Sequence, residues 1–296
     1  MISGTPPIRT TFYLMTDKSL HKKRPAPNSL DEIQETLAPL SANPASTGIF
    51  LDLDGTLAPI MPRPDDVTIP SEVSRLIRRL SHAYLAVTVV SGRPAAGAKR
   101  IVGNAELAYI GNHGFETLLP GHAVVVCEEA KPYIPGIREL IDYCRHNEKM
   151  AESGIWLEDK TATMSFHFRR AHDPEQAVAF IRENFFPKIE ALGLAVTEGR
   201  KVIEVRPPMP VNKGVAVGQL LDRLDCRQAI YIGDDTTDVD ALRELRKRQR
   251  RKDHIMIGVG VISEEMPKEI ARYSDLLVER ISGVEQVLQL LAGEEL

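Results

Sequence analysis

The chain has 296 residues and a formal net charge of −4; 43% of its residues are hydrophobic and 5% are aromatic. This composition is ordinary for a globular protein, and the length allows one large domain or two modest ones. The slightly acidic charge and the few aromatic residues argue against nucleic acid as a partner. No membrane span is expected, because no run approaches 18 consecutive apolar residues. The widely spaced cysteines form no metal-ligand pattern, and no apolar segment typical of a signal peptide begins the chain, so we expect a cytoplasmic protein.

The first residues of the chain have no hydrophobic periodicity. Residues 1–27 are rich in proline, lysine, serine and threonine, which predicts a poorly ordered segment. Ser29 and Glu32 have the spacing of a capping box, so we expect a short helix from there to Leu40. Because a linker-like stretch follows this helix, we assign residues 1–45 to an N-terminal extension that is partly disordered.

Two carboxylates follow the first expected strand. Residues 49–51 are apolar and predict a buried strand, so Asp52 and Asp54 should project to the same side at its carboxyl end, before a turn at Gly55. In such a pair, one carboxylate can attack phosphorus, while the other protonates the leaving oxygen and later activates water. A calcium-binding or turn-capping loop is the alternative explanation of this pattern.

Strands and helices alternate on both sides of the middle of the chain. The expected strands comprise residues 49–51, 85–90, 108–110, 229–232, 255–259 and 276–278. Helical spacing of apolar residues separates them, and one of the helices opens at Lys213. This alternation predicts an α/β fold with a doubly wound, Rossmann-like parallel sheet, and places the chemistry at the carboxyl ends of its strands.

The middle of the chain follows a different pattern. Polar and apolar residues alternate over residues 161–169, which is typical of an antiparallel strand with one packed face. Further strands are expected at residues 123–127 and 200–206, and helices at 134–147 and 174–191. We therefore predict an inserted α+β cap domain over residues 117–206, inside a core that is made of residues 46–116 and 207–296.

Reactive residues occur in four separate segments of the expected core. Asp52 and Asp54 come first, Ser91 follows a strand, Lys213 opens a helix, and residues 233–238 read Gly-Asp-Asp-Thr-Thr-Asp. A phosphate ester requires a nucleophile, donors for its oxygens, a cation that offsets charge and usually Mg²⁺, which prefers oxygen ligands. Each later segment alone is compatible with a plain turn, a solvated helix start or an acidic turn. The four in this order favour phosphoryl transfer.

Residues 46–296 resemble the haloacid dehalogenase-like (HAD) phosphatases and, within them, the trehalose-6-phosphate phosphatases. The core motifs are typical of the whole superfamily, whereas the motifs in and beside the insert are typical of the smaller family. The resemblance rests on residues 50–57, 90–93, 111–114, 160–169, 199–207, 212–214 and 232–238.

The resemblance implies a role for each reactive core residue. Asp52 would be the nucleophile that forms an aspartyl-phosphate, and Asp54 would act as general acid and then as general base. Ser91 and Lys213 would bind the phosphoryl oxygens, and Lys213 would also offset the charge of Asp52.

The resemblance also implies a Mg²⁺ site. Asp234 would hold the ion together with the carboxylate of Asp52 and the backbone carbonyl of Asp54. Asp235 and Asp238 would be outer-shell or secondary ligands.

The insert is implied to be a mobile cap that recognises the sugar, and the 111–114 loop is implied to line the cleft beneath it. A disaccharide presents many hydroxyl groups, for which paired charged donors and acceptors are suitable partners. The alternative is that these charged residues are only solvated. The candidate substrate-binding residues are Arg93, His113, Gly114, Glu158, Lys160, His167, Arg169, Arg200 and Glu204.

The expected substrate is trehalose 6-phosphate, and the expected partner is this small molecule alone, without nucleic acid or membrane, bound by a monomer. Hydrolysis of sucrose 6-phosphate or of a glycosyl-phosphoglycerate, a phosphomutase reaction and a non-catalytic sugar-phosphate sensor are the alternatives. A basic run over residues 246–252 is either an interaction patch or a solvated helix end.

Overall fold

The computed structural model describes residues 25–61, 63, 66–199, 201–264 and 266–294. The chain forms two compact units. The core unit contains Arg24–Glu129 and Met209–Leu296, and the inserted unit contains Ala130–Pro208. Within the described residues, none of the helices combines the length and the apolar character needed to cross a bilayer.

The core unit is built around an eight-stranded sheet in the order β12-β11-β10-β1-β2-β3-β4-β5. All neighbouring strands from β12 to β3 pair in parallel, and β4 and β5 are added antiparallel at one edge. The fold is therefore α/β, as predicted. The strands are β1 (Thr47–Asp52), β2 (Ala86–Val90), β3 (Ala108–Gly111), β4 (Glu116–Leu118), β5 (Val125–Val126), β10 (Gln228–Gly233), β11 (Ile255–Ile262) and β12 (Leu276–Glu279).

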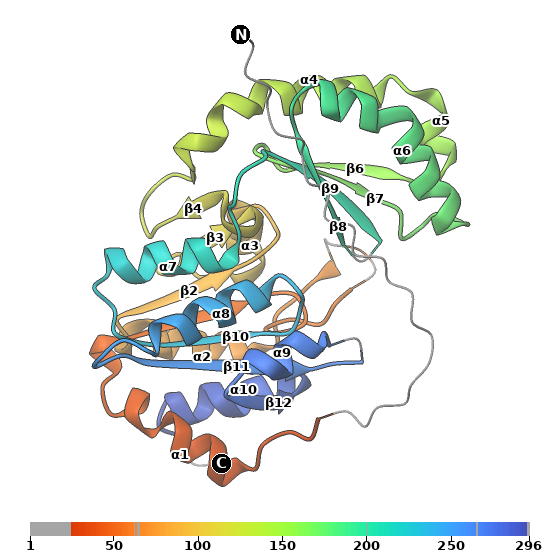
Figure 1. Cartoon of the computed structure of the whole chain (residues 1–296). Coiled ribbons are helices and arrows are strands. Elements are labelled where there is room, and N and C mark those ends of the chain that lie inside the picture. The colour runs from red at the N-terminus through yellow and green to blue at the C-terminus, as the bar shows by residue number, and fades with distance from the viewer. Residues whose placement is uncertain (1–24, 62, 64–65, 200, 265, 295–296) are drawn as a thin grey trace. The chain divides into compact units, whose positions relative to one another are not determined.

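Helices cover both faces of this sheet, and Figure 1 shows α7 and α8 side by side over one of them. Buried side chains of α1, α2, α3 and α10 share one apolar cluster with the sheet, while those of α7, α8 and α9 share the other. The helices are α1 (Leu30–Ser41), α2 (Ser71–Ala83), α3 (Ala95–Val102), α7 (Lys213–Arg223), α8 (Asp238–Arg248), α9 (Lys268–Tyr273) and α10 (Arg280–Leu291).

The central strand β1 shows why the sequence folds in this way. Ile49, Phe50 and Leu51 are all fully buried. Because side chains alternate along a strand, Ile49 and Leu51 pack into one apolar cluster and Phe50 into the other. A strand with helices on both faces must be apolar throughout, and this strand ends where its first carboxylate appears, at Asp52.

Two predicted domain boundaries differ from the structure. The capping box at Ser29 and Glu32 is confirmed, but α1 buries Ile33, Leu37 and Leu40 in the core instead of belonging to an extension. In the sequence, the single apolar stripe of this helix is compatible with an extension and equally with a surface helix packed on a larger core. Residues 1–24 of the predicted extension lie outside the described residues.

The second boundary that differs is the start of the insert. Residues 117–129, which we assigned to the cap, belong to the core unit, because β4 and β5 extend its sheet by antiparallel pairing. The inserted unit begins at Ala130. Local patterns predict that a strand exists but not which sheet it joins, so this error could not be avoided from the sequence.

The inserted unit contains a four-stranded antiparallel sheet in the order β6-β7-β9-β8. Its apolar cluster joins Met164, Phe166, Ile203 and Val205 to the helices, which confirms the packed face expected from the alternation. The predicted strand over residues 161–169 is shorter, because residues 160–163 form the turn before it, with a positive φ of 67° at Thr161. The elements are α4 (Ile134–Arg145), α5 (Glu148–Glu152), β6 (Trp156–Asp159), β7 (Met164–His167), α6 (Pro174–Ala191), β8 (Ala195–Gly199) and β9 (Val202–Arg206).

Candidate active site

A buried ion pair lies at the carboxyl end of β1. The Lys213 Nζ atom, from the first residue of α7, lies 2.5 Å from Asp52 Oδ1. The side chains are 3% and 6% exposed, respectively. Asn212 caps α7 by accepting a hydrogen bond from Val215 N, which fixes the start of the helix and hence the position of the lysine. Asp52, the predicted nucleophile, is therefore in direct contact with Lys213, the residue predicted to offset its charge.

Asp238 is fully buried and organises the groups around this pair. Its Oδ1 atom accepts hydrogen bonds from Lys213 Nζ and from the hydroxyl of Tyr231, both at 2.6 Å. Its Oδ2 atom accepts the backbone N–H groups of Asp234 and Asp235 at 3.0 and 2.9 Å. With both oxygens so engaged, Asp238 holds the lysine and shapes the loop before α8.

Asp234 approaches Asp52 from the neighbouring strand β10. Carboxylate oxygens of Asp52, Asp234 and Asp238 lie within 4.8 Å of one another. The Thr56 hydroxyl donates to Asp234 Oδ1 at 3.2 Å. A Cβ atom on Gly55, whose φ is +94°, would lie 2.4 Å from Asp234 Oδ2, so the turn requires glycine for two reasons.

The charges of this cluster suit a cation with oxygen ligands. Burial, followed by the charges of Asp238 and Asp235, raises the pKa of Asp234 to about 7. Burial and then Asp238 raise the pKa of Asp52 well above its usual value. Burial opposes the charge of Lys213, but Asp238 and Asp52 raise its pKa above the usual range. One lysine does not balance three buried carboxylates, and Mg²⁺ prefers such ligands, so these residues fit the predicted ion.

Asp235 and Asp238, both predicted as outer-shell or secondary ligands, lie in different surroundings. Asp235 is exposed, whereas Asp238 belongs to the buried carboxylate group described above. The reason is local: Asp238 begins α8 and its carboxylate accepts hydrogen bonds from backbone N–H groups of the loop, whereas Asp235 is exposed to solvent. Spacing within a loop does not reveal which of its acids turns inward.

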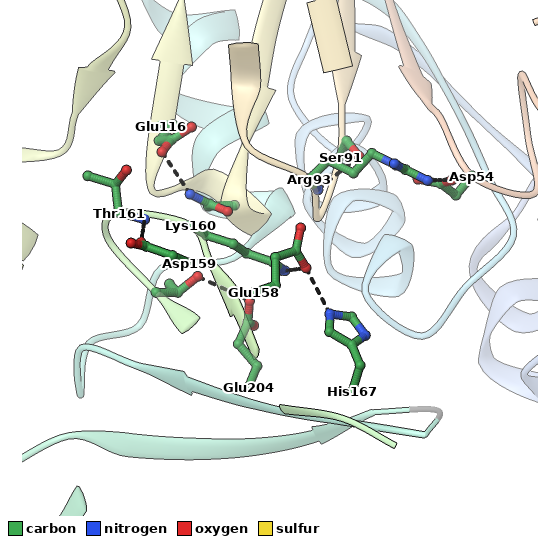
Figure 2. A network of polar contacts seen from close by, with 12 residues as sticks. Asp54, Ser91, Arg93, Glu116, Glu158, Asp159, Lys160, Thr161, His167 and Glu204 are labelled. Atoms are coloured by element: carbon green, nitrogen blue, oxygen red, sulfur yellow. Dashed lines mark hydrogen bonds and ion pairs between the residues drawn. The ribbon is translucent and has the colours of Figure 1, made fainter. Parts of the chain in front are cut away.

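Arg93 binds the predicted general acid and base, as Figure 2 shows. Its Nε and Nη2 atoms each donate to one carboxylate oxygen of Asp54 at 2.7 Å. Both side chains are partly exposed, at 19% and 33%. A fork-like pair of this kind fixes the orientation of the carboxylate as well as its position. The sequence predicts Arg93 as a substrate-binding residue, and the structure shows that its guanidinium also orients Asp54.

Ser91 lies at the carboxyl end of β2 and is buried. Its Oγ atom accepts the N–H of Arg93 at 3.1 Å, and its backbone carbonyl accepts the N–H of His113 at 3.1 Å. His113 also packs against Gly92, where an added Cβ atom would lie 2.5 Å from the imidazole. Gly114 packs against the chain just before Lys213, because its Cβ position is 2.9 Å from Asn212 O. The predicted residues His113 and Gly114 thus support Ser91 and Lys213.

A second polar cluster lies on the inserted sheet, on the face opposite its helices (Figure 2). Glu204 Oε1 accepts hydrogen bonds from Lys160 Nζ and Thr163 Oγ1, both at 3.3 Å. Lys160 Nζ lies 3.8 Å from Glu158, and His167 Nε2 lies 2.8 Å from the same carboxylate. Four of the predicted sugar-binding residues therefore form one connected network.

Two other predicted sugar-binding residues belong to the inserted unit. Arg169 is exposed in the turn after β7, not on the strand, because β7 ends at His167. Arg200 lies outside the described residues. A residue that we did not predict, Trp156, stacks on His167 with ring centroids 4.1 Å apart. Trp156 lies two residues before Glu158, and residues with this spacing on a strand share a face, which is the signal by which the sequence could have indicated it.

Comparisons with known proteins agree with this geometry. The sequence profile described as trehalose-phosphatase matches residues 50–277. The chain belongs to the trehalose-phosphatase family. As a member of this family, it is a phosphatase.

Several curated relatives are plant proteins of moderate identity. The probable trehalose-phosphate phosphatase H of Arabidopsis thaliana is 32% identical over 90% of this chain and 79% of its own length. Trehalose 6-phosphate phosphatase RA3 of Zea mays is 30% identical over 83% of this chain and 69% of its own length. Trehalose-phosphate phosphatase B of Arabidopsis thaliana is 30% identical, and this chain spans 62% of it.

Solved structures share the α/β fold of this trehalose-phosphatase family member. The C-terminal domain of trehalose-6-phosphate phosphatase from C. albicans has a TM-score of 0.68 at 22% identity, covering 91% of this chain and 98% of that chain. A trehalose-6-phosphate phosphatase related protein has a TM-score of 0.69 at 21% identity, covering 83% and 97%. At these identities the likeness establishes the fold alone.

Proposed function

We propose that this protein hydrolyses trehalose 6-phosphate to trehalose and inorganic phosphate, with Asp52 as the nucleophile. The observation that carries the proposal is the buried contact of Asp52 with Lys213 at the end of the central strand, in a chain of the trehalose-phosphatase family. A lysine in this position attracts the phosphoryl group and holds one carboxylate oxygen still.

The proposed reaction has two steps. Asp52 Oδ1 is held by Lys213, so Oδ2 attacks phosphorus, and the bond between phosphorus and the sugar oxygen breaks. Asp54 donates a proton to the leaving sugar oxygen. Asp54 then takes a proton from water, which attacks the aspartyl-phosphate and releases phosphate. Arg93 orients Asp54 for both transfers, and Ser91 offers its hydroxyl to the phosphoryl oxygens.

Asp52 and Asp234 are the residues that we propose to hold Mg²⁺, because their carboxylates converge and carry excess negative charge. When bound, the ion would offset the charge of the phosphate as it approaches Asp52. Asp238 would not need to be a direct ligand, since four hydrogen-bond donors already engage its two oxygens.

The polar network of the inserted sheet is the proposed recognition site for the sugar. Glu158, Lys160, His167 and Glu204 place acceptors and donors within a few ångströms of one another on one face. Sugar hydroxyls both donate and accept hydrogen bonds, so such a mixed cluster can bind several of them at once.

The test is a comparison of phosphate esters with purified protein and Mg²⁺. We expect trehalose 6-phosphate to be hydrolysed with a higher kcat/KM than sucrose 6-phosphate, a glycosyl-phosphoglycerate or p-nitrophenyl phosphate, with trehalose as the product. Asp52→Asn should lower kcat by about four orders of magnitude or more. Asp253→Asn is the matched control: Asp253 is exposed with a positive φ that asparagine tolerates, so activity should not change.

Three outcomes would contradict the proposal. Faster hydrolysis of another sugar phosphate would show that this other ester is the substrate. Conversion to an isomeric sugar phosphate without release of free phosphate would indicate a phosphomutase. Binding of trehalose 6-phosphate without any turnover would indicate a sensor.

A further inference from the structure

Glu116 is a buried carboxylate, 4% exposed, to which the proposed reaction gives no role. It begins β4 and ends a short loop, residues 111–116, which we call the support loop. Its Oε2 atom accepts the backbone N–H of Ala95 at 2.8 Å, and its Oε1 atom accepts the side-chain amide of Asn112 at 2.8 Å. One carboxylate therefore joins two separate segments of the core unit.

The first of these segments is the start of α3, which directly follows Ser91 and Arg93. The first backbone N–H groups of a helix have no partner inside the helix, and a carboxylate there also interacts favourably with the helix dipole. The two segments lie in close contact: a Cβ atom on Gly111 would be 2.2 Å from Ala95 N. Glu116 thus fixes the point at which the chain leaves the Ser91 turn.

The second segment is the support loop itself, which forms a template for the Ser91 turn. The N–H groups of Asn112 and His113 donate to the carbonyls of Arg93 and Ser91 at 2.8 and 3.1 Å. Asn112 and His113 have positive φ values of 49° and 56°; asparagine and histidine tolerate this conformation better than most residues, but it still costs free energy and gains from the support of other contacts. The bond from Glu116 to the Asn112 side chain supplies such support.

We propose that Glu116 is a positioning residue for the phosphoryl site, which holds Ser91 and Arg93, and through Arg93 also Asp54, in their working geometry. The inference rests on the proposed phosphatase chemistry but not on the identity of the sugar. A glutamine in this position offers only one acceptor oxygen. One of the two N–H donors would then face the NH₂ group, and the two segments would separate.

The test uses Glu116→Gln in the full chain, with Asp275→Asn as the matched control. Asp275 also accepts a backbone N–H, from Gly258 at 2.8 Å, so both variants change a carboxylate to an amide that faces a backbone donor. Measurements are the melting temperature, kcat/KM for trehalose 6-phosphate and p-nitrophenyl phosphate well below melting, and the affinity for inorganic phosphate by calorimetry.

For Glu116→Gln we expect kcat/KM to fall about 10- to 100-fold, by the same factor for both esters, because displaced groups act on the phosphate and not on the sugar. Phosphate affinity should weaken as well. Asp275→Asn should lower only the melting temperature. If Glu116 is merely structural, its variant will melt earlier with unchanged kinetics and phosphate affinity, which would overturn the proposal.

If Glu116→Gln does not fold, Asn112→Ala removes the same bond from the other side. We expect a smaller loss that is again equal for the two esters, and unchanged kinetics would overturn the proposal equally. Failure of the proposed function is distinguishable, because it appears in the wild-type protein as an absence of trehalose 6-phosphate hydrolysis. Phosphate calorimetry still tests Glu116 in that case.

Discussion

The buried acids around Lys213 repel one another electrostatically when they are ionised. Asp52, Asp234 and Asp238 converge on one lysine, and each is almost entirely removed from water. Burial of like charges raises the free energy of the ionised site, and an ion or a proton must offset it. This electrostatic strain connects the stability of the protein to the chemistry that we propose.

We expect Mg²⁺ to stabilise the protein in a pH-dependent way. Burial, and then Asp238 and Asp235, raise the pKa of Asp234 from 3.8 to about 7. The folded protein thus retains a proton that the unfolded chain has lost. This contribution to stability is complete below the unfolded pKa of 3.8 and is lost as the pH rises through about 7. Because Mg²⁺ competes with that proton, it should raise the melting temperature more at about pH 8 than at about pH 5.5.

Melting curves with Mg²⁺ and with chelator at both pH values test this expectation. Asp234→Asn, which cannot ionise, should abolish most of the stabilisation by Mg²⁺ at either pH. An equal shift at the two pH values in the wild-type protein would show that Asp234 does not control binding of the ion.

At the level of elements, α1 links distant parts of the chain. Asn28, just before α1, exchanges two hydrogen bonds with the backbone of Leu277 in β12. Ile33, Leu37 and Leu40 complete the apolar layer over one face of the sheet. The helix is therefore an integral part of the core unit, although it precedes residues 50–57, the first of the phosphatase motifs along the chain.

Leu37→Ala should test this role of α1. Leu37 is 1% exposed, and removal of its side chain should leave a cavity that lowers the free energy of unfolding by about 2–5 kcal/mol. Glu35→Ala, on the exposed side of the same helix, should change it by less than about 0.5 kcal/mol. Urea unfolding monitored by circular dichroism measures both. Equal effects would mean that α1 is the peripheral extension that the sequence predicted.

At the scale of the whole molecule, the two units carry different groups of functional residues. The phosphoryl chemistry that we propose belongs to the core unit, which is assembled from both ends of the chain. The proposed sugar contacts belong to the inserted unit, whose polar network is held on its own sheet. Substrate choice and reaction chemistry should therefore be separable by mutation.

Glu204→Gln should impair the sugar phosphate selectively. A hydrogen bond to a charged group contributes roughly 1.5–3 kcal/mol, so kcat/KM for trehalose 6-phosphate should fall by about one to two orders of magnitude. p-Nitrophenyl phosphate has no sugar hydroxyls and should be little affected. Glu198→Gln is the matched control, since Glu198 lies on the adjacent strand and pairs with Arg182 instead. Equal losses on both esters would show that Glu204 supports folding or chemistry.

Several features were determined by the sequence alone, because each depends on a few neighbouring residues. The apolar run before Asp52 and the capping box of α1 predict local structure directly. The order of strands and helices then predicts the parallel sheet and the meeting of Asp52, Lys213 and Asp234 at one edge of it.

Other features were decided only by the tertiary structure. Asp238, and not Asp235, joins the buried carboxylates because of its bond to Lys213, 25 residues away in the chain. Glu116 is engaged by Ala95, 21 residues before it. Strand β5 joins the core sheet, although its sequence would suit either sheet. The physical reason is common to all three: burial and partner choice depend on surfaces that exist only once distant segments pack together, whereas helix and strand periodicity is already present in each segment.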